Sequence, residues 1–126
     1  MNQQSIQNCQ KTLQKLTDFL VIDERINEEY THAAVIQAFE FTFEVFWKTF
    51  QKIGQAEGVT IGSPKAAFLF AYQSGLIENE NIWLDLLHDR NMTTHTYHEV
   101  VAHQILKRIR EHYLDAFQYA YQKLMN

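Results

Sequence analysis

Residues that interrupt helices are rare in this sequence and are confined to one stretch. Only four glycines and one proline occur among 126 residues, and all of them lie between Gly54 and Gly75. Elsewhere apolar side chains recur every three or four positions, which is the spacing of one helix face, and no segment shows the alternation of a half-buried strand. We therefore predict an all-α fold, a five-helix, mostly antiparallel bundle.

The composition supplies enough apolar material for one core. Apolar residues make up 46% and aromatic residues 13% of the chain, so neither a disulfide nor a structural metal is required, and we expect residues 1–126 to form a single domain. Cys9 has no internal partner, which favours a reducing compartment. The first residues lack the pattern of a signal peptide, and no apolar run approaches the roughly 20 residues of a membrane span. We expect a cytoplasmic protein without a membrane partner.

The charge balance limits how the chain can meet nucleic acid. A net charge of −4 argues against coating nucleic acid through bulk positive charge, but it allows a nuclease that grips one or two phosphates in a cleft. The local basic cluster, Lys107, Arg108 and Arg110, either lines such a cleft or is solvated on an outer helix face.

Two long helices are expected in the first half of the chain. The first covers about residues 3–21, and the polar residues 23–29 connect it to a second over about 31–55. The second carries apolar residues around most of its circumference, so it is either central in the bundle or shared with a partner subunit. We therefore predict a homodimer. These residues are Ala34, Phe39, Phe41, Phe43, Val45, Phe46, Trp47, Phe50 and Ile53.

Capping residues delimit the remaining helices. Ser63 and Pro64 indicate a helix start that Gly75 closes, and a fourth helix begins near Asn79. Thr96 and Glu99 fit a capping box, which predicts a last helix running to about residue 124.

The chemistry of this chain is predicted to lie between Arg90 and Tyr97. With Thr96 as the cap, His95 would lie just outside the last helix and Tyr97 would be its first residue. Free backbone N–H groups at a helix N-terminus form an anion site, and phosphate is the obvious anion. Arg90 can offer a planar fork of donors, and His95 titrates near neutral pH and can move protons.

Each of these residues also has an ordinary structural interpretation. Arg90 can be read as a surface cation, His95 as the partner of a loop carbonyl, and Tyr97 as a buried anchor. Asn91 either caps the preceding helix or lends a donor to the cleft. Supporting residues follow at helical spacing: Glu40 and Glu44 can orient Arg90 or hold a proton, or Glu44 can simply pair with Lys48.

Metal and cofactor sites are not expected. His98 and His103 are one residue too far apart for the zinc motif, which places them about 140° apart around a helix. No ligand set has suitable spacing, Cys9 has no neighbouring base, and a glycine-rich phosphate loop is absent from the sequence.

Three blocks of sequence resemble a known family. The pattern of Arg90, four residues, His95, one residue and Tyr97 is similar to the motif of the HEPN superfamily of helical ribonucleases and toxins. Residues 83–97, 39–48 and 75–77 resemble one branch of it, the nucleotidyltransferase substrate-binding proteins related to the HepT toxins. The resemblance runs from about residue 30 to the C-terminus, with Ala38 as a departure where relatives are expected to carry a basic residue.

The resemblance implies partners and a reaction. Such proteins are encoded beside a small nucleotidyltransferase, form a complex with it, and dimerise so that two Arg–His motifs face a shared cleft. In toxin members the motif cuts RNA without a metal, and the partner silences it by adding AMP to the motif tyrosine, which here is Tyr97. The alternative is a binding module that presents a substrate to the nucleotidyltransferase and cuts nothing. A helical interaction protein without a site is a third, less favoured interpretation.

Overall fold

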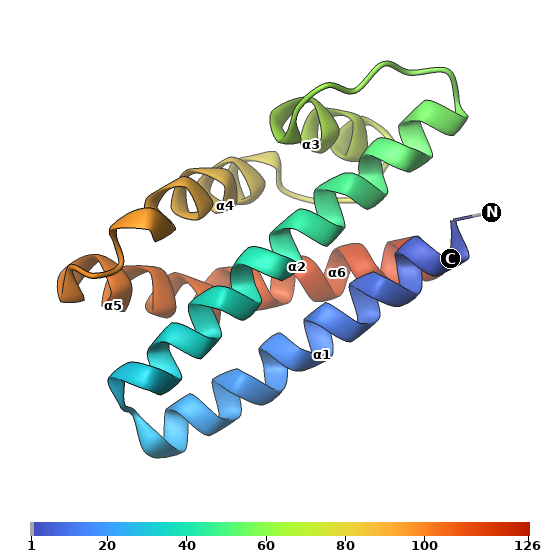
Figure 1. The fold of residues 1–126 in the computed structure, drawn as a ribbon. Helices are drawn as coiled ribbons and strands as arrows, with labels where there is room; N and C mark the ends of the chain where they lie inside the picture. The colour runs from blue at the N-terminus through green and yellow to red at the C-terminus, as the bar shows by residue number, and fades with distance from the viewer. Residues whose placement is uncertain (1) are drawn as a thin grey trace.

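The computed structural model describes residues 2–126, and these are helical throughout apart from short connections (Figure 1). The last three helical segments, over residues 99–125, follow one another directly and form one continuous helical rod, the C-terminal rod. Counted in this way, the described chain contains five helical rods, as predicted. None of the helices within residues 2–126 combines the length and apolar character needed to cross a bilayer. The elements are α1 (Gln3–Ile26), α2 (Glu29–Ala56), α3 (Pro64–Gln73), α4 (Glu80–Met92), the 3₁₀ turn η1 (Thr93–His95), α5 (Glu99–Arg108), the π turn η2 (Ile109–Tyr113) and α6 (Leu114–Met125).

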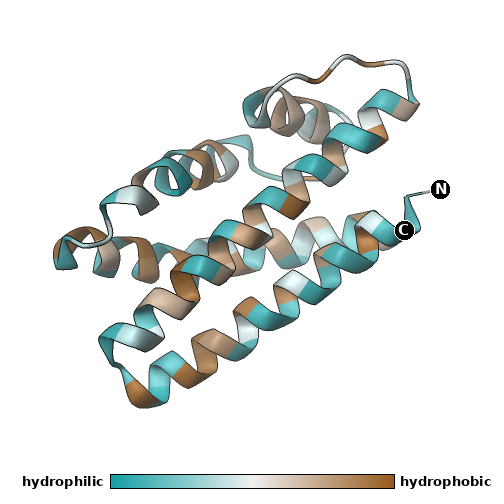
Figure 2. Cartoon of the chain, in the orientation of Figure 1, coloured by the Kyte–Doolittle hydropathy of each residue, from teal (hydrophilic) through white to brown (hydrophobic). Residues whose placement is uncertain are grey.

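The core lies between α2 and the elements that surround it. α1 and α2 form an antiparallel hairpin, α6 packs on α1, and α3 and α4 cover the remaining side of α2 (Figure 1). Figure 2 shows apolar and polar bands following one another along every helix, and the buried apolar residues of these helices form the core. Trp83 of α4 is almost fully buried at the centre, and its ring lies 5.0–6.2 Å from four phenylalanine rings, those of Phe46, Phe50, Phe68 and Phe117. Packing of these rings joins α2, α3, α4 and α6.

The predicted caps of the third and fourth helices are confirmed. The Ser63 hydroxyl accepts a hydrogen bond from the backbone N–H of Ala66, and the Asn79 side chain accepts one from Asn81. Gly75 ends the third helix with a φ of 76°, a left-handed conformation that glycine adopts without steric cost.

The first helix is longer than predicted. It continues to Ile26 rather than ending near Val21, and the polar residue that suggested a loop, Asp23, is fully buried. Asp23 accepts hydrogen bonds from the Thr31 hydroxyl at 2.6 Å and from Arg110, and its carboxylate lies 2.6 Å from Nδ1 of His32. These partners replace the water that the charge loses on burial.

The predicted capping box at the start of the last helix is wrong. α5 begins at Glu99 with His98 at the cap position, two residues later than expected. The Thr96 hydroxyl instead donates to the backbone carbonyl of Thr93, and the Glu99 carboxylate lies 3.5 Å from His103. The hydroxyl is used to close the 3₁₀ turn, so Tyr97 precedes the helix instead of opening it.

The basic cluster gathers neither at one cleft nor on one solvated face, because two of its members are paired elsewhere. Residues two apart on a helix point to nearly opposite sides. Arg108 accordingly reaches Asp89 on α4, whereas Arg110, at the start of the π turn η2, reaches Asp23 on α1. These ion pairs attach the C-terminal rod to two other helices.

The Asp23 cluster should make stability depend on pH. Burial alone would raise the pKa of the Asp23 carboxyl, but the hydrogen bonds from its partners outweigh burial and hold the pKa below its usual range. A lowered native pKa adds stability above the unfolded pKa of about 3.9, and this stability is lost as the pH falls through the native value. Asp23→Asn should therefore reduce the free energy of unfolding by about 3 kcal/mol at pH 7, as when one member of a buried pair is removed.

Urea denaturation across the pH range measures this effect. The difference between the wild-type protein and Asp23→Asn should shrink below about pH 4, while Asp18→Asn, at an exposed position of α1, should change stability little at any pH. A deficit of Asp23→Asn that stays constant down to pH 2 would contradict the assignment.

Candidate functional site

Arg90 is held at the end of α4 by side chains from two elements. Its Nη1 donates to Glu40 Oε2 of α2 at 3.0 Å and to the Thr93 hydroxyl at 3.0 Å. The Thr93 hydroxyl lies 2.7 Å from the same Glu40 oxygen and 2.7 Å from the Arg90 carbonyl. Arg90, Glu40 and Thr93 therefore form a closed cluster that fixes the guanidinium relative to α2.

A second glutamate adds to the acidic surroundings of Arg90. Glu44 Oε1 lies 3.8 Å from Arg90 Nε, beyond hydrogen-bond distance, and this buried Nε has no acceptor within the described chain. Glu44 also lies 3.8 Å from Lys48 and accepts a hydrogen bond from the indole of Trp47. The structure therefore contains the contacts that both interpretations of the Glu40–Glu44–Lys48 stripe require. The two glutamates lie beside Arg90, and Glu44 also pairs with Lys48.

The residue before Arg90 anchors the last turn of α4. Asp89 is 2% exposed and accepts hydrogen bonds from Arg108 Nε at 2.6 Å and Nη2 at 2.9 Å, and from the Tyr113 hydroxyl. The hydrogen bonds to Asp89 raise the pKa of Arg108, and burial followed by the bond to Asp89 raises the pKa of Tyr113 far above its usual range. Arg108 therefore stays charged and Tyr113 neutral, and this rigid three-residue cluster positions the Arg90 backbone.

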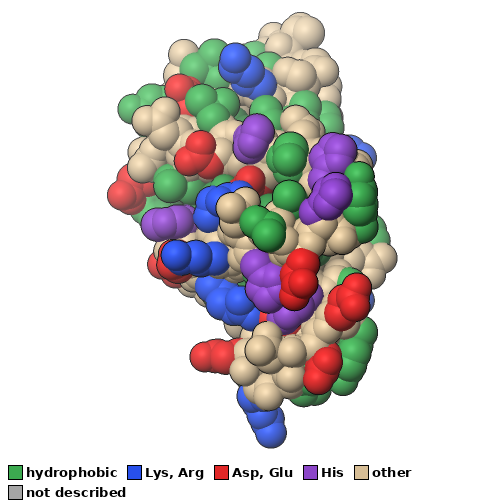
Figure 3. All heavy atoms as spheres, turned by 90° about the vertical axis from the view of Figure 1, so that its left-hand side faces the viewer, with side chains coloured by type: hydrophobic (Ala, Val, Ile, Leu, Met, Phe, Trp, Pro, Cys, Tyr) green, Lys and Arg blue, Asp and Glu red, His purple; other side chains and the backbone are tan. Residues whose placement is uncertain are grey.

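The other predicted site residues lie on the surface, Asn91 in the last turn of α4 and His95 and Tyr97 after it. His95 ends η1 and is exposed, and Tyr97 follows with 75% of its surface exposed. Their ring centroids lie 6.2 Å apart, and the Tyr97 ring lies 4.3 Å from that of His98. Asn91 is exposed too, and its carbonyl accepts a hydrogen bond from Thr94 at 3.4 Å. Figure 3 looks onto this side of the molecule and shows histidines interspersed with basic and acidic side chains.

Two positioning residues were missed by sequence reasoning. Thr93 was not among the predicted site residues, although its hydroxyl bridges Arg90 and Glu40. Asp89 was not predicted either, and its partners lie 19 and 24 residues away in the sequence. One signal was available, since Thr93 is three residues after Arg90 and so on the same helical side.

The arrangement combines an oriented guanidinium with accessible imidazole and phenol groups. A fixed guanidinium can bind a phosphoryl oxygen, and an exposed imidazole can donate or accept a proton. Cys9 offers no comparable chemistry, because burial raises the pKa of its thiol to about 11.

Comparison with known proteins gives the family. The family model described as nucleotidyltransferase substrate binding protein like matches residues 4–126. The chain belongs to this family. It is also similar to a protein of Thermus thermophilus of known crystal structure, with 29% sequence identity and a TM-score of 0.82 over 94% of this chain and 99% of that one. A search of curated proteins gave no match.

Proposed function

We propose that the chain is the HEPN-type partner, or substrate-binding subunit, of a minimal nucleotidyltransferase in a toxin–antitoxin-like pair. Membership of a family named for nucleotidyltransferases supports the pairing, and the HepT-like motif of Arg90, His95 and Tyr97 supports the finer branch. In this proposal the chain is a metal-independent endoribonuclease that the partner silences by adenylylating Tyr97. The observation that carries the proposal is the fixed Arg90 guanidinium followed, within seven residues, by an exposed imidazole and an exposed phenol.

The proposed reaction is attack of an RNA 2′-hydroxyl on the adjacent phosphorus. The new bond to the 2′-oxygen closes a 2′,3′-cyclic phosphate while the bond from phosphorus to the 5′-oxygen of the next nucleotide breaks. The 2′-hydroxyl loses a proton and the leaving 5′-oxygen gains one. His95 transfers protons, and Arg90 stabilises the charge that builds on the phosphoryl oxygens in the transition state. Glu40 and Thr93 keep the guanidinium in place, so little side-chain entropy remains to be lost when phosphate binds.

One observation favours the binding-module alternative. Within the described residues the His95 imidazole has no hydrogen-bond partner that would orient it, and the positive charge of Arg90 is already opposed by Glu40 and Glu44. A protein that only presents Tyr97 or another substrate to the nucleotidyltransferase needs neither an oriented base nor a free cation.

A homodimer forms part of the proposal. Phe41, on the outer side of α2, is 55% exposed, and such a large apolar side chain is more stable when a second subunit covers it. Light scattering at micromolar concentration should give twice the chain mass of 14.9 kDa. Phe41→Glu should weaken the dimer at least about tenfold, and a wild-type monomer at this concentration would contradict the proposal.

Adenylylation is tested by mass spectrometry. Co-expression with the neighbouring nucleotidyltransferase, with ATP and magnesium available, should add AMP to the intact protein, and Tyr97→Phe should abolish the added mass. The partner must supply the base and metals because a protonated phenol is a poor nucleophile. Tyr30→Phe is the matched control, since Tyr30 is 68% exposed and lies on α2. Modification that persists in Tyr97→Phe would mean that another residue is the acceptor.

Ribonuclease activity is tested on the unmodified protein with single-stranded and transfer RNA. Cleavage should survive EDTA and leave 2′,3′-cyclic phosphate ends, and AMP on Tyr97 should block it. His95→Ala and Arg90→Ala should each lower the rate on the order of a hundredfold or more, as expected for loss of a positioned acid–base or charge-stabilising group. His112→Ala, an exposed histidine of η2, is the control. Intact RNA at high protein concentration would favour the binding module.

A further inference from the structure

A second group of titratable side chains lies apart from Arg90 and His95, in a cleft between the start of α2 and the start of α5. The cleft has a volume of about 690 Å³. Ala33, Ile36 and Ala102 contribute apolar walls, whereas its polar lining comes from Asn27, Glu28, Glu29, His32, Thr96, Tyr97, Glu99 and His103. Two imidazoles and three carboxylates in one cleft favour a cation over an anion.

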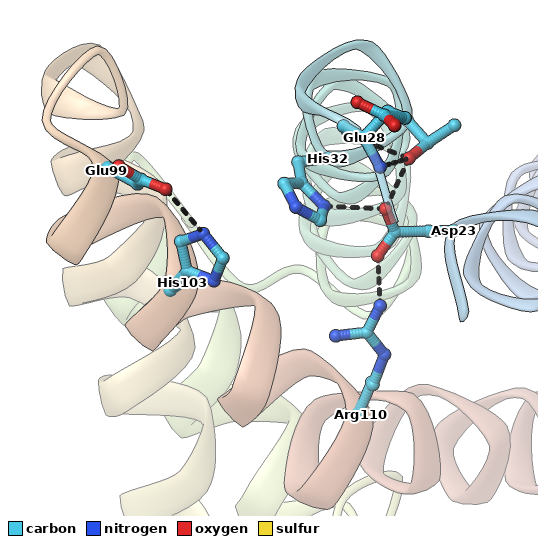
Figure 4. A network of polar contacts seen from close by, with 7 residues as sticks. Asp23, Glu28, His32, Glu99, His103 and Arg110 are labelled. Atoms are coloured by element: carbon cyan, nitrogen blue, oxygen red, sulfur yellow. Dashed lines mark hydrogen bonds and ion pairs between the residues drawn. The ribbon is translucent and has the colours of Figure 1, made fainter. Parts of the chain in front are cut away.

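His32 is held as a metal-binding histidine usually is. Its Nδ1 lies 2.6 Å from the fully buried Asp23 carboxylate, which Thr31 and Arg110 hold in turn (Figure 4). A carboxylate on one ring nitrogen fixes the orientation of the imidazole and makes the other nitrogen the better ligand. Nε2 of His32 is therefore the nitrogen left for a ligand in the cleft.

His103 lies opposite His32 at a suitable separation. The two ring centroids are 5.0 Å apart, and two imidazoles that share a tetrahedral zinc ion at about 2.0 Å have centroids roughly 5 Å apart. Glu99, one turn before His103, lies 3.5 Å from the His103 Nε2 and brings a carboxylate to the same imidazole (Figure 4).

From these contacts we propose that His32, His103 and Glu99 bind a divalent transition-metal ion of the zinc class across the cleft. Within residues 2–126 no group of three His, Cys, Asp or Glu side chains is placed so that it could hold a metal ion, so binding requires side-chain rotation. Rotation is available because Glu99 is 88% and His103 51% exposed, while His32 is held by Asp23. The bound ion would join α2 to α5 and fix the segment that carries Thr96 and Tyr97.

Cobalt(II) titration of the full chain, first freed of metal with a chelator, tests the site. One equivalent per chain should bind with the visible absorption of a four-coordinate ion, and Zn²⁺ should displace it. His103→Ala should weaken binding at least about tenfold, and Glu99→Gln should weaken it measurably. Both positions are exposed, so these variants should fold normally. Binding should weaken as the pH falls, because protons compete with the metal ion for its ligands.

Two further measurements make the test decisive. Long-range ¹H–¹⁵N NMR spectra should show zinc-dependent shifts of the His32 and His103 imidazole nitrogens, and His112→Ala should bind cobalt like the wild-type protein. The proposal is overturned if the wild-type chain shows no saturable binding, if His103→Ala binds unchanged, or if His112→Ala loses binding equally. None of these outcomes depends on the nuclease proposal, since the cleft is lined by neither Arg90 nor His95. None depends on adenylylation either, because Tyr97 lines the cleft but is not one of the three proposed ligands.

Discussion

A buried carboxylate is tolerated in a helical bundle only when its charge is matched, and two such carboxylates determine how the C-terminal rod packs. Asp89 of α4 accepts hydrogen bonds from Arg108 and Tyr113, and Asp23 of α1 accepts one from Arg110. Nearby positions of the C-terminal rod are therefore bound to two different helices. An unmatched charge at either place would cost several kcal/mol. The same two pairs also fix both regions of functional interest, since Asp89 directly precedes Arg90 and Asp23 contacts His32.

Much of the fold follows from local rules. Helix periodicity and the caps at Ser63, Asn79 and Gly75 place the middle helices to within a residue or two, because these signals act between residues close in sequence. The predictions fail where contacts with residues distant in the sequence determine the local structure. From its own segment Asp23 is expected to lie in a loop, because a charged residue is costly to bury. Its partners His32 and Arg110 make burial possible, and since they lie outside the segment, the extension of α1 could not be predicted from it.

The candidate site shows the same division. The stripe of Glu40 and Glu44 indicated possible partners for Arg90, and the structure brings these side chains to 3.0 and 3.8 Å. The capping box failed because Thr96 and Glu99 satisfy a sequence pattern while their side chains have competing local partners, the Thr93 carbonyl and His103. A pattern of four residues does not contain the information that decides between those partners. The contact between His32 and His103, 71 positions apart by their numbering, is likewise beyond any local rule.

The high exposure of Tyr97 has a thermodynamic consequence. With three quarters of its surface in solvent, the side chain contributes little to the packing that keeps the chain folded. A covalent group attached to its hydroxyl would therefore leave the native core almost unchanged, and the modified and unmodified forms would unfold at nearly the same temperature. A modification of this tyrosine, and its removal, would therefore not require the protein to pass through a less stable form.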